Sequence, residues 1–168
     1  MRPVFFLILL LISIRASSQS TDDLKQYPVK KGVANAALTK EFSRIIKSYS
    51  NNFAVLKSED KTVSIVDTVY RLKLNFKEKN DATLTFEKSD INLSISFYLD
   101  AAGVKAIFNE ISSALPADFV YTREYDAEAK QTNYIFFSKN GPINNYPEKI
   151  YLITDANNTA VLTILKYR

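Results

Sequence analysis

Apolar side chains recur every three or four residues between positions 35 and 50, which places them on one face of a helix. Polar and basic residues occupy the opposite face of the same segment. Asn35 is the predicted N-cap, because a short polar side chain at that position can accept hydrogen bonds from the first-turn amides. The pattern therefore predicts an amphipathic helix that covers a hydrophobic core. Its apolar face consists of Leu38, Phe42, Ile45, Ile46 and Tyr49.

A second stretch with helical spacing runs from Asp100 to Pro116. Asp100 is the predicted N-cap, and Pro116 is the predicted stop, since proline cannot continue a helix that needs its backbone N–H. The second predicted helix is amphipathic like the first. Its apolar face consists of Val104, Ile107, Phe108, Ile111 and Leu115.

After each predicted helix the period of the pattern changes from about 3.6 to 2, which indicates β-strands. The clearest run spans residues 91–99, where Ile, Leu and Phe alternate with Asn and Ser. Strands with one apolar and one polar side are typical of antiparallel sheets that are solvated on one face. The other predicted strands lie at 53–56, 68–77, 83–86, 118–125, 132–139, 149–154 and 160–167.

The two predicted helices align without a gap at an offset of 66 residues, so that Phe42, Ile45 and Phe53 match Phe108, Ile111 and Phe119. About four predicted strands follow each helix. The sequence therefore predicts an α+β fold made of two tandem repeats, at residues 34–99 and 100–168. Each repeat would be one helix packed on a mostly antiparallel four-stranded sheet, and the two would form one compact unit.

Residues 1–18 have the pattern of a secretory signal peptide: Arg2 precedes an apolar core at residues 4–14, and small residues follow. The spacing of the small residues predicts cleavage between Ser18 and Gln19. A retained membrane anchor is the alternative, but the apolar core is short for a membrane span, which needs about 20 residues. We therefore expect export to the periplasm or the extracellular space, with no membrane span after processing.

Residues 19–33 are polar, contain Pro28 and Gly32, and predict a flexible lead-in. Because Arg2 and Arg15 belong to the predicted signal peptide, 20 basic residues face 18 acidic ones in the remaining chain. Such a small excess of positive charge gives no electrostatic footprint for nucleic acid. A nucleic-acid partner is therefore not expected.

Several residue types are missing or rare. The chain has no Cys and no His, and only three Gly. These absences exclude disulfides, zinc sites built on Cys and His, and a histidine general base. The scattered glycines form no phosphate-binding loop. We predict a protein that is not an enzyme and carries no cofactor or metal.

The carboxylates Glu124, Asp126 and Glu128 are the densest acidic cluster, but they fall where a hairpin turn is predicted. They are interpreted as solvated turn charges.

The strands of the second predicted repeat are apolar on both sides. Tyr134 and Phe136 alternate with Ile135 and Phe137. Either the first repeat covers the second side, or this side binds a partner, since tyrosine combines contact area with a polar group. The turn-rich loop at 138–148 is a further candidate for binding. The predicted interaction surface consists of Tyr121, Tyr134, Phe136, Tyr146 and Tyr151.

In its element order and its 66-residue offset the chain resembles β-lactamase inhibitor proteins and PepSY-like modules, over most of residues 33–168. The inhibitor proteins carry disulfides that this chain cannot form. The Ser18–Gln19 junction is similar to that of small exported proteins of Bacteroidota. The resemblance implies an exported binding module and does not indicate its target.

Two functions remain open from the sequence. The first is a non-enzymatic module that binds an unidentified protein, peptide or envelope component. The alternative is a small hydrolase, or a domain that binds a lipid or small molecule in a pocket between the two halves. The absence of histidine and of glycine-rich loops favours the first.

Overall fold

A computed structural model of the chain describes residues 25–32, 35–72, 74–76 and 80–167. The predicted signal peptide and its cleavage site between Ser18 and Gln19 lie outside the described residues. The helices are α2 (Ala36–Lys47) and α3 (Ala101–Ala114), with the 3₁₀ turns η2 (Ser48–Asn51) and η3 (Ala54–Leu56) after α2. The strands are β1 (Gln26–Pro28), β2 (Lys61–Val63), β3 (Asp67–Arg71), β4 (Asn80–Glu87), β5 (Asp90–Tyr98), β6 (Phe119–Asp126), β7 (Gln131–Ser138), β8 (Lys149–Asp155) and β9 (Thr159–Tyr167).

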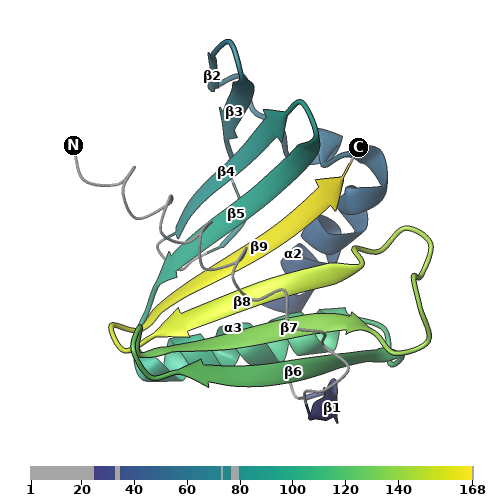
Figure 1. Cartoon of the computed structure of the whole chain (residues 1–168), viewed down its shortest axis with the longest axis vertical. Coiled ribbons are helices and arrows are strands. Elements are labelled where there is room, and N and C mark those ends of the chain that lie inside the picture. Colours follow the sequence, from purple (N-terminus) through teal and green to yellow (C-terminus); the bar gives the residue numbers. More distant parts are fainter. Residues whose placement is uncertain (1–24, 33–34, 73, 77–79, 168) are drawn as a thin grey trace.

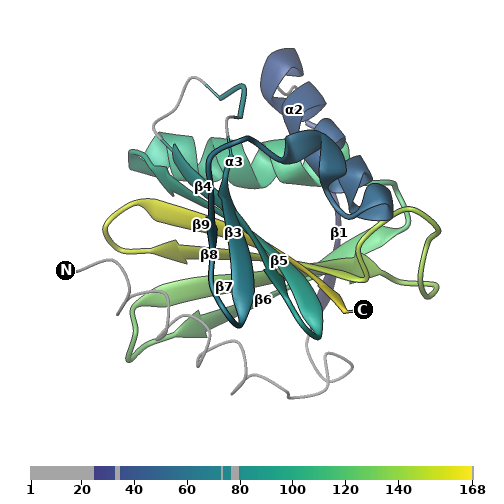
Figure 2. The same cartoon turned by 90° about the horizontal axis from the view of Figure 1, so that it is seen from above.

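All nine strands belong to one antiparallel sheet, in the order β1-β6-β7-β8-β9-β5-β4-β3-β2. Both helices lie on the same side of this sheet (Figures 1 and 2). The predicted α+β fold of two tandem repeats at 34–99 and 100–168, each with its own four-stranded sheet, is therefore wrong. The described residues instead form one continuous sheet with two helices on one face.

The pairing of β5 with β9 explains this difference. Every residue of β5 from Asp90 to Tyr98 has an antiparallel partner in β9, from Tyr167 to Thr159. Leu93 lies opposite Ile164 and Ile95 opposite Leu162, so the apolar side chains of both strands point to the same face. The strands that follow α2 and those that follow α3 thus share one core layer, and no sheet boundary separates them.

Local sequence accounts for the helix ends. The side chain of Asn35 accepts hydrogen bonds from the backbone N–H groups of Ala37 and Leu38, at 3.1 and 3.5 Å. Asp100 does the same for the N–H of Gly103 at 2.7 Å, and α3 ends before Pro116. Both predicted N-caps are confirmed, and each satisfies amides that the first helical turn leaves without partners.

Three segments differ from the predicted elements. The segment 53–56, predicted as a strand, forms the 3₁₀ turn η3. Phe53, which precedes this turn, has a φ of 57° and a fully buried side chain. This backbone conformation is incompatible with an extended strand. The predicted flexible lead-in at 19–33 also contains a strand, because Gln26–Pro28 pair with β6 as β1. The Lys31 ammonium group donates hydrogen bonds to the Ser113 and Leu115 carbonyl oxygens at the end of α3.

The predicted strand at 68–77 stops at Arg71, where β3 ends. Beyond it the backbone N–H of Asn75 donates a hydrogen bond to the Glu41 carboxylate in α2, at 3.0 Å. Phe76 then packs against Phe42 and Phe97, with ring centroids 5.0 Å apart in each pair. The segment after β3 therefore leaves the sheet and packs against α2 and the core.

The core lies between the sheet and the two helices. Leu84, Leu93, Phe136, Leu152 and Leu162 supply fully buried side chains from five strands. The helices contribute apolar residues from the faces that were predicted to cover the core. Those that are at most 1% exposed are Phe42, Ile45, Ile46, Ile107 and Ile111. The alternation and the helical spacing thus identified the core correctly.

Glu41 is a buried carboxylate on α2, and Arg44 binds it with two hydrogen bonds, Nε to Oε2 at 2.8 Å and NH2 to Oε1 at 2.5 Å. The Arg44 hydrogen bonds and the Asn75 N–H hold the pKa of Glu41 below its ordinary value, against the opposing effect of burial. Since the pKa is lowered in the folded state, the stabilisation is present above the ordinary carboxyl pKa. It is lost as the pH falls through the folded-state value.

Glu41→Gln is expected to destabilise the fold near neutral pH by about 1 kcal/mol, because a neutral amide replaces the ionised carboxylate that pairs with Arg44. The free energy of unfolding of both proteins should be measured by urea denaturation from about pH 7 down to about pH 3, where carboxylates become protonated. The difference between them should shrink toward acid pH. A difference that does not change with pH would contradict the assignment to the ionised Glu41.

Candidate binding face

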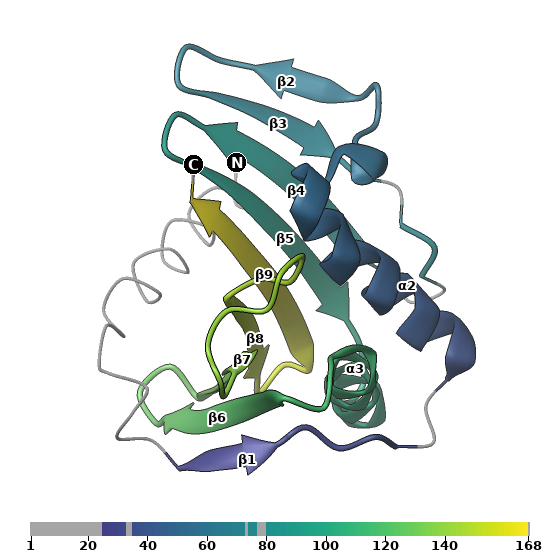
Figure 3. The ribbon, with the colours of Figure 1, turned by 90° about the vertical axis from the view of Figure 1, so that its right-hand side faces the viewer.

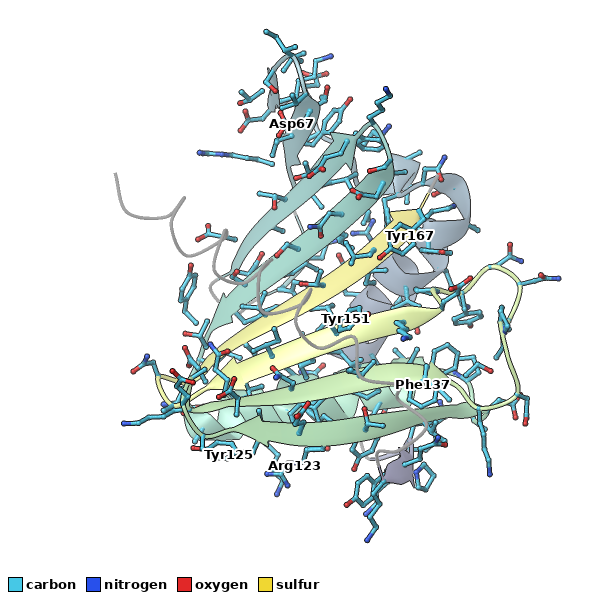
Figure 4. The ribbon with its side chains drawn as sticks, in the orientation of Figure 1. Asp67, Arg123, Tyr125, Phe137, Tyr151 and Tyr167 are labelled. Atoms are coloured by element: carbon cyan, nitrogen blue, oxygen red, sulfur yellow. The ribbon has the colours of Figure 1, made fainter. Side chains whose placement is uncertain are left out.

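The side of the sheet opposite the helices carries its own set of side chains. Ile150 and Leu152 in β8 are fully buried under the helices, so Tyr151 and Ile153 between and after them point to the other side. The same alternation holds in the neighbouring strands. We call this side the helix-free face, and it is turned toward the viewer in Figures 1 and 4. Its central residues are Thr83, Thr85, Asn92, Ser94, Ser96, Val120, Thr122, Ile135, Phe137, Tyr151, Ile153, Val161, Thr163 and Leu165.

The strand register divides the helix-free face into two halves. One row of directly opposed residues crosses it, from Thr83 through Ser94, Thr163 and Tyr151 to Ile135. The β4–β5 end of the face is made of hydroxyl and amide side chains. The β7–β9 end is mostly apolar, with Thr163 as the polar residue nearest to Tyr151. An apolar patch therefore lies beside a polar band on the same sheet.

Side chains of the apolar half range from buried to half-buried. Ile153 and Val120 are 7% and 9% exposed. Around them Ile135, Phe137, Tyr151, Val161 and Leu165 are half-buried. Within the described part of the chain, no helix or strand lies over this half (Figures 1 and 3). We name these seven residues the apolar patch.

Tyr151 lies at the centre of the apolar patch (Figure 4). It belongs to β8, which lies between β7 and β9 in the sheet. Burial raises the pKa of its phenol above the ordinary value, and the nearby Tyr167 phenol raises it further. Tyr167 lies at the end of β9 and is 75% exposed. The hydroxyl of Tyr151 is therefore a neutral hydrogen-bonding group in apolar surroundings at every physiological pH.

Three buried side-chain oxygens of the helix-free face lack a hydrogen-bond partner among the described residues: Asn92 Oδ1, Asn133 Oδ1 and Thr163 Oγ1. Each buried unpaired oxygen costs about 1–3 kcal/mol relative to a paired one. They lie in β5, β7 and β9, on both sides of Tyr151.

The structure separates the predicted interaction surface into two faces. Tyr121, Tyr134 and Phe136 point toward α3, where the Phe108 ring contacts all three at centroid distances of 5.1, 4.8 and 5.6 Å. Phe136 is fully buried, and Tyr146 of the 138–148 loop packs against Phe119 at 6.0 Å. Of the predicted residues, Tyr151 alone belongs to the helix-free face. The other four contribute to the core and its margin.

Sequence reasoning did not select the remaining members of the apolar patch as binding residues, although the alternation had placed Ile135 and Phe137 opposite Tyr134 and Phe136. The signal was present in the double-sided apolar pattern of β7 and β8. The pattern did not show which side of the sheet the helices cover.

The acidic cluster forms the predicted turn. Asp126 Oδ1 accepts hydrogen bonds from the backbone N–H groups of Glu128 and Ala129, at 3.0 and 2.9 Å, and closes the β6–β7 hairpin. Glu124, Asp126 and Glu128 are all exposed. Within the described ranges no group of three or more acidic side chains could hold a metal ion, and no helix combines the length and the apolar character that a membrane crossing requires.

Comparisons with protein families, with curated proteins and with solved structures give no significant match to this chain. The resemblance to β-lactamase inhibitor proteins and PepSY-like modules stays a prediction.

Proposed function

We propose that the chain is an exported, non-enzymatic binding module that docks a protein partner on the apolar patch of its helix-free face. One contrast within the sheet supports the proposal. Antiparallel sheets that face water on one side carry polar residues there. On the helix-free face β4 and β5 do so, with Thr83, Thr85 and Ser94, whereas β7–β9 present mostly aliphatic and aromatic side chains.

The chemistry of the face favours a protein as the partner. Protein interfaces combine an apolar and aromatic centre, depleted in charge, with a polar rim. The apolar patch contains no charged residue, and Thr163, Ser94 and Ser96 border it on one side. Lys149 and Glu124 lie at opposite borders, next to Phe137 and Asn133. A partner surface with an apolar centre and hydrogen-bond donors for the bordering oxygens would complement it.

The signal-peptide pattern at residues 1–18 supports the exported location, in the periplasm or outside the cell. The alternative of a hydrolase or a small-molecule carrier placed its pocket between two separate halves. The pairing of β5 with β9 in one sheet favours the binding module over this alternative.

The proposal is tested with the double substitution Ile135→Thr and Val161→Thr, which removes apolar contact area but keeps β-branched side chains suited to strands. Proteins retained by the immobilised chain from an envelope extract of the source cells should be identified, and their affinities measured by titration. Truncating two central interface residues should weaken binding by about tenfold or more. Tyr125→Ala is the matched control, because Tyr125 is 62% exposed on the opposite side of the sheet. Equal affinity of the double variant and the control would contradict the proposal.

A further inference from the structure

The β2–β3 hairpin lies at the end of the sheet and projects beyond the helices (Figures 1 and 3). Its hydrogen bonds define which backbone groups of β2 are free. The Arg71 N–H donates to the Asp60 carbonyl at 3.0 Å, and the Ser64 N–H donates to the Asp67 carbonyl at 2.9 Å. In an antiparallel pair, inward- and outward-directed residues alternate. The N–H and C=O groups of Lys61 and Val63 therefore point away from the sheet.

The opposite edge of the sheet is blocked at one of its two outward-directed positions. There the Val29 N–H donates to the Phe119 carbonyl at 3.3 Å, which makes Tyr27 inward-directed and Pro28 outward-directed. Proline has no N–H, so β1 cannot donate a hydrogen bond to a further strand at that position. Proteins commonly protect sheet edges in this way. The β2 edge contains no proline, and no other described strand pairs with its two outward positions.

The tip of the hairpin carries aliphatic side chains at unusual positions. Ile65 and Val66 occupy the two central positions of the turn and are 105% and 74% exposed, and neighbouring Val63 is 64% exposed. Tight turns favour glycine, asparagine, aspartate and proline at their corners. Ser64 Oγ accepts hydrogen bonds from the N–H groups of Val66 and Asp67, at 3.2 and 3.1 Å, and fixes the turn. An ordered turn thus presents aliphatic side chains that contribute little to the core.

We propose that the β2 edge binds an extended segment of another protein, which adds to the sheet as a tenth strand beside β2. The outward N–H and C=O groups of Lys61 and Val63 supply the main-chain hydrogen bonds of strand addition. The exposed aliphatic side chains of Val63, Ile65 and Val66 supply contacts for apolar residues at alternate positions of the added segment. The expected ligand is a peptide segment with high β-propensity and alternating apolar side chains.

Two other occupants fit this edge less well. Two copies of the chain could pair their β2 strands antiparallel, with Thr62 at the symmetry axis. Lys61 of one copy would then lie diagonally across from Lys61 of the other on the same face, and like charges in strand pairs are unfavourable. A membrane surface attracts basic clusters. Around the hairpin, Lys61 is accompanied by Glu59, Asp60 and Asp67. A separate extended segment meets neither difficulty.

The test uses a phage-displayed library of random peptides selected on the purified full chain. Val63→Pro removes the outward N–H of residue 63 and leaves the hydrogen bonds between β2 and β3 in place. An unchanged thermal unfolding transition would verify that this variant keeps the fold. Selected peptides should alternate apolar residues and bind Val63→Pro at least tenfold more weakly. Val63→Thr retains the N–H and should lose less affinity. Peptide binding should also slow the exchange of the Lys61 and Val63 amide protons.

Several outcomes would overturn the proposal. These are failure to select peptides, peptides that bind Val63→Pro as tightly as the original chain, and protection of amides elsewhere. Dimerisation that Val63→Pro abolishes would assign the edge to a second copy. Binding of the chain to phosphatidylcholine vesicles through Ile65 would assign it to a membrane. Because the variants of the apolar patch lie in β7 and β9, failure at one surface leaves the other unaffected.

Discussion

Phe42→Ala is expected to lower the free energy of unfolding by about 3–5 kcal/mol, the usual cost of truncating a buried phenylalanine. Phe42 is fully buried and joins α2 to β5 through Phe97 and to the segment after β3 through Phe76, at ring-centroid distances of 6.0 and 5.0 Å. Its removal leaves a cavity at the centre of the layer between helix and strands. Since domains of this size are stable by about 5–15 kcal/mol, the loss is a large share of the total. Urea denaturation followed by circular dichroism measures it.

Val55→Ala is the control, because Val55 is 61% exposed in the turn after α2. Its free energy of unfolding should stay within about 0.5 kcal/mol of the original protein. Similar stabilities of the two variants would show that α2 does not pack on the sheet through Phe42.

The second large effect is expected at Glu110, a buried carboxylate on α3 that binds the N-terminus of α2. Its Oε1 accepts the backbone N–H of Asn35 at 2.7 Å, and its Oε2 accepts the hydroxyl of Thr39. The negative charge also lies at the positive end of the α2 dipole. Glu110→Ala leaves both donors without this partner and should cost about 2–3 kcal/mol, measured by urea denaturation.

A double-mutant cycle separates this interaction from general packing. Glu110→Ala and Thr39→Val should be combined, and a coupling of about 0.5–3 kcal/mol is expected for residues in one hydrogen-bonded network. Glu110→Gln, which keeps an acceptor oxygen, should cost less than Glu110→Ala. Glu87→Ala, at an exposed strand end, is the surface control. Additive effects of the two substitutions would refute the hydrogen bond between Glu110 and Thr39.

The sequence predicted the elements of this fold better than their arrangement. Helical spacing located both helices, and the short polar side chains of Asn35 and Asp100 located their starts, because capping is decided by neighbouring residues. Alternation located β5 and the four strands after α3 to within a residue or two, since those strands are long and strongly patterned. Local interactions determine each of these features.

Strand neighbours follow from long-range contacts, which explains the wrong fold prediction. The pattern at Leu93 and Ile95 shows that these side chains are buried, but it does not show that β9 is their partner. A repeat at an offset of 66 residues suggested two separate sheets, whereas the pairing of β5 with β9 makes them one. Tertiary contacts likewise overrode the strand pattern at Phe53 and Phe76, whose rings pack against aromatic neighbours from the turn after α2 and from α2 itself.

The same limit applies to the binding face. Alternation placed Tyr134 and Tyr151 on strands that are apolar on both sides, and tyrosine content alone then suggested a binding role for both. Which residues α3 covers depends on how the helix packs, and the Phe108 ring lies 4.8 Å from Tyr134. Tyr151 points to the side without helices. The number of aromatic residues was therefore a weaker guide than the direction of each side chain.

The pairing of β5 with β9 is the feature on which the single sheet and its helix-free face depend. Native-state amide hydrogen exchange across these two strands tests it most directly, because strands at the centre of one cooperative unit exchange only through global unfolding. The central amides of β5, from Leu93 to Ile95, and of β9, from Leu162 to Ile164, should exchange with the same free energy, equal to that of global unfolding. Exchange of either strand at a distinctly lower free energy, while the other stays protected, would show two separately unfolding halves and contradict the single sheet.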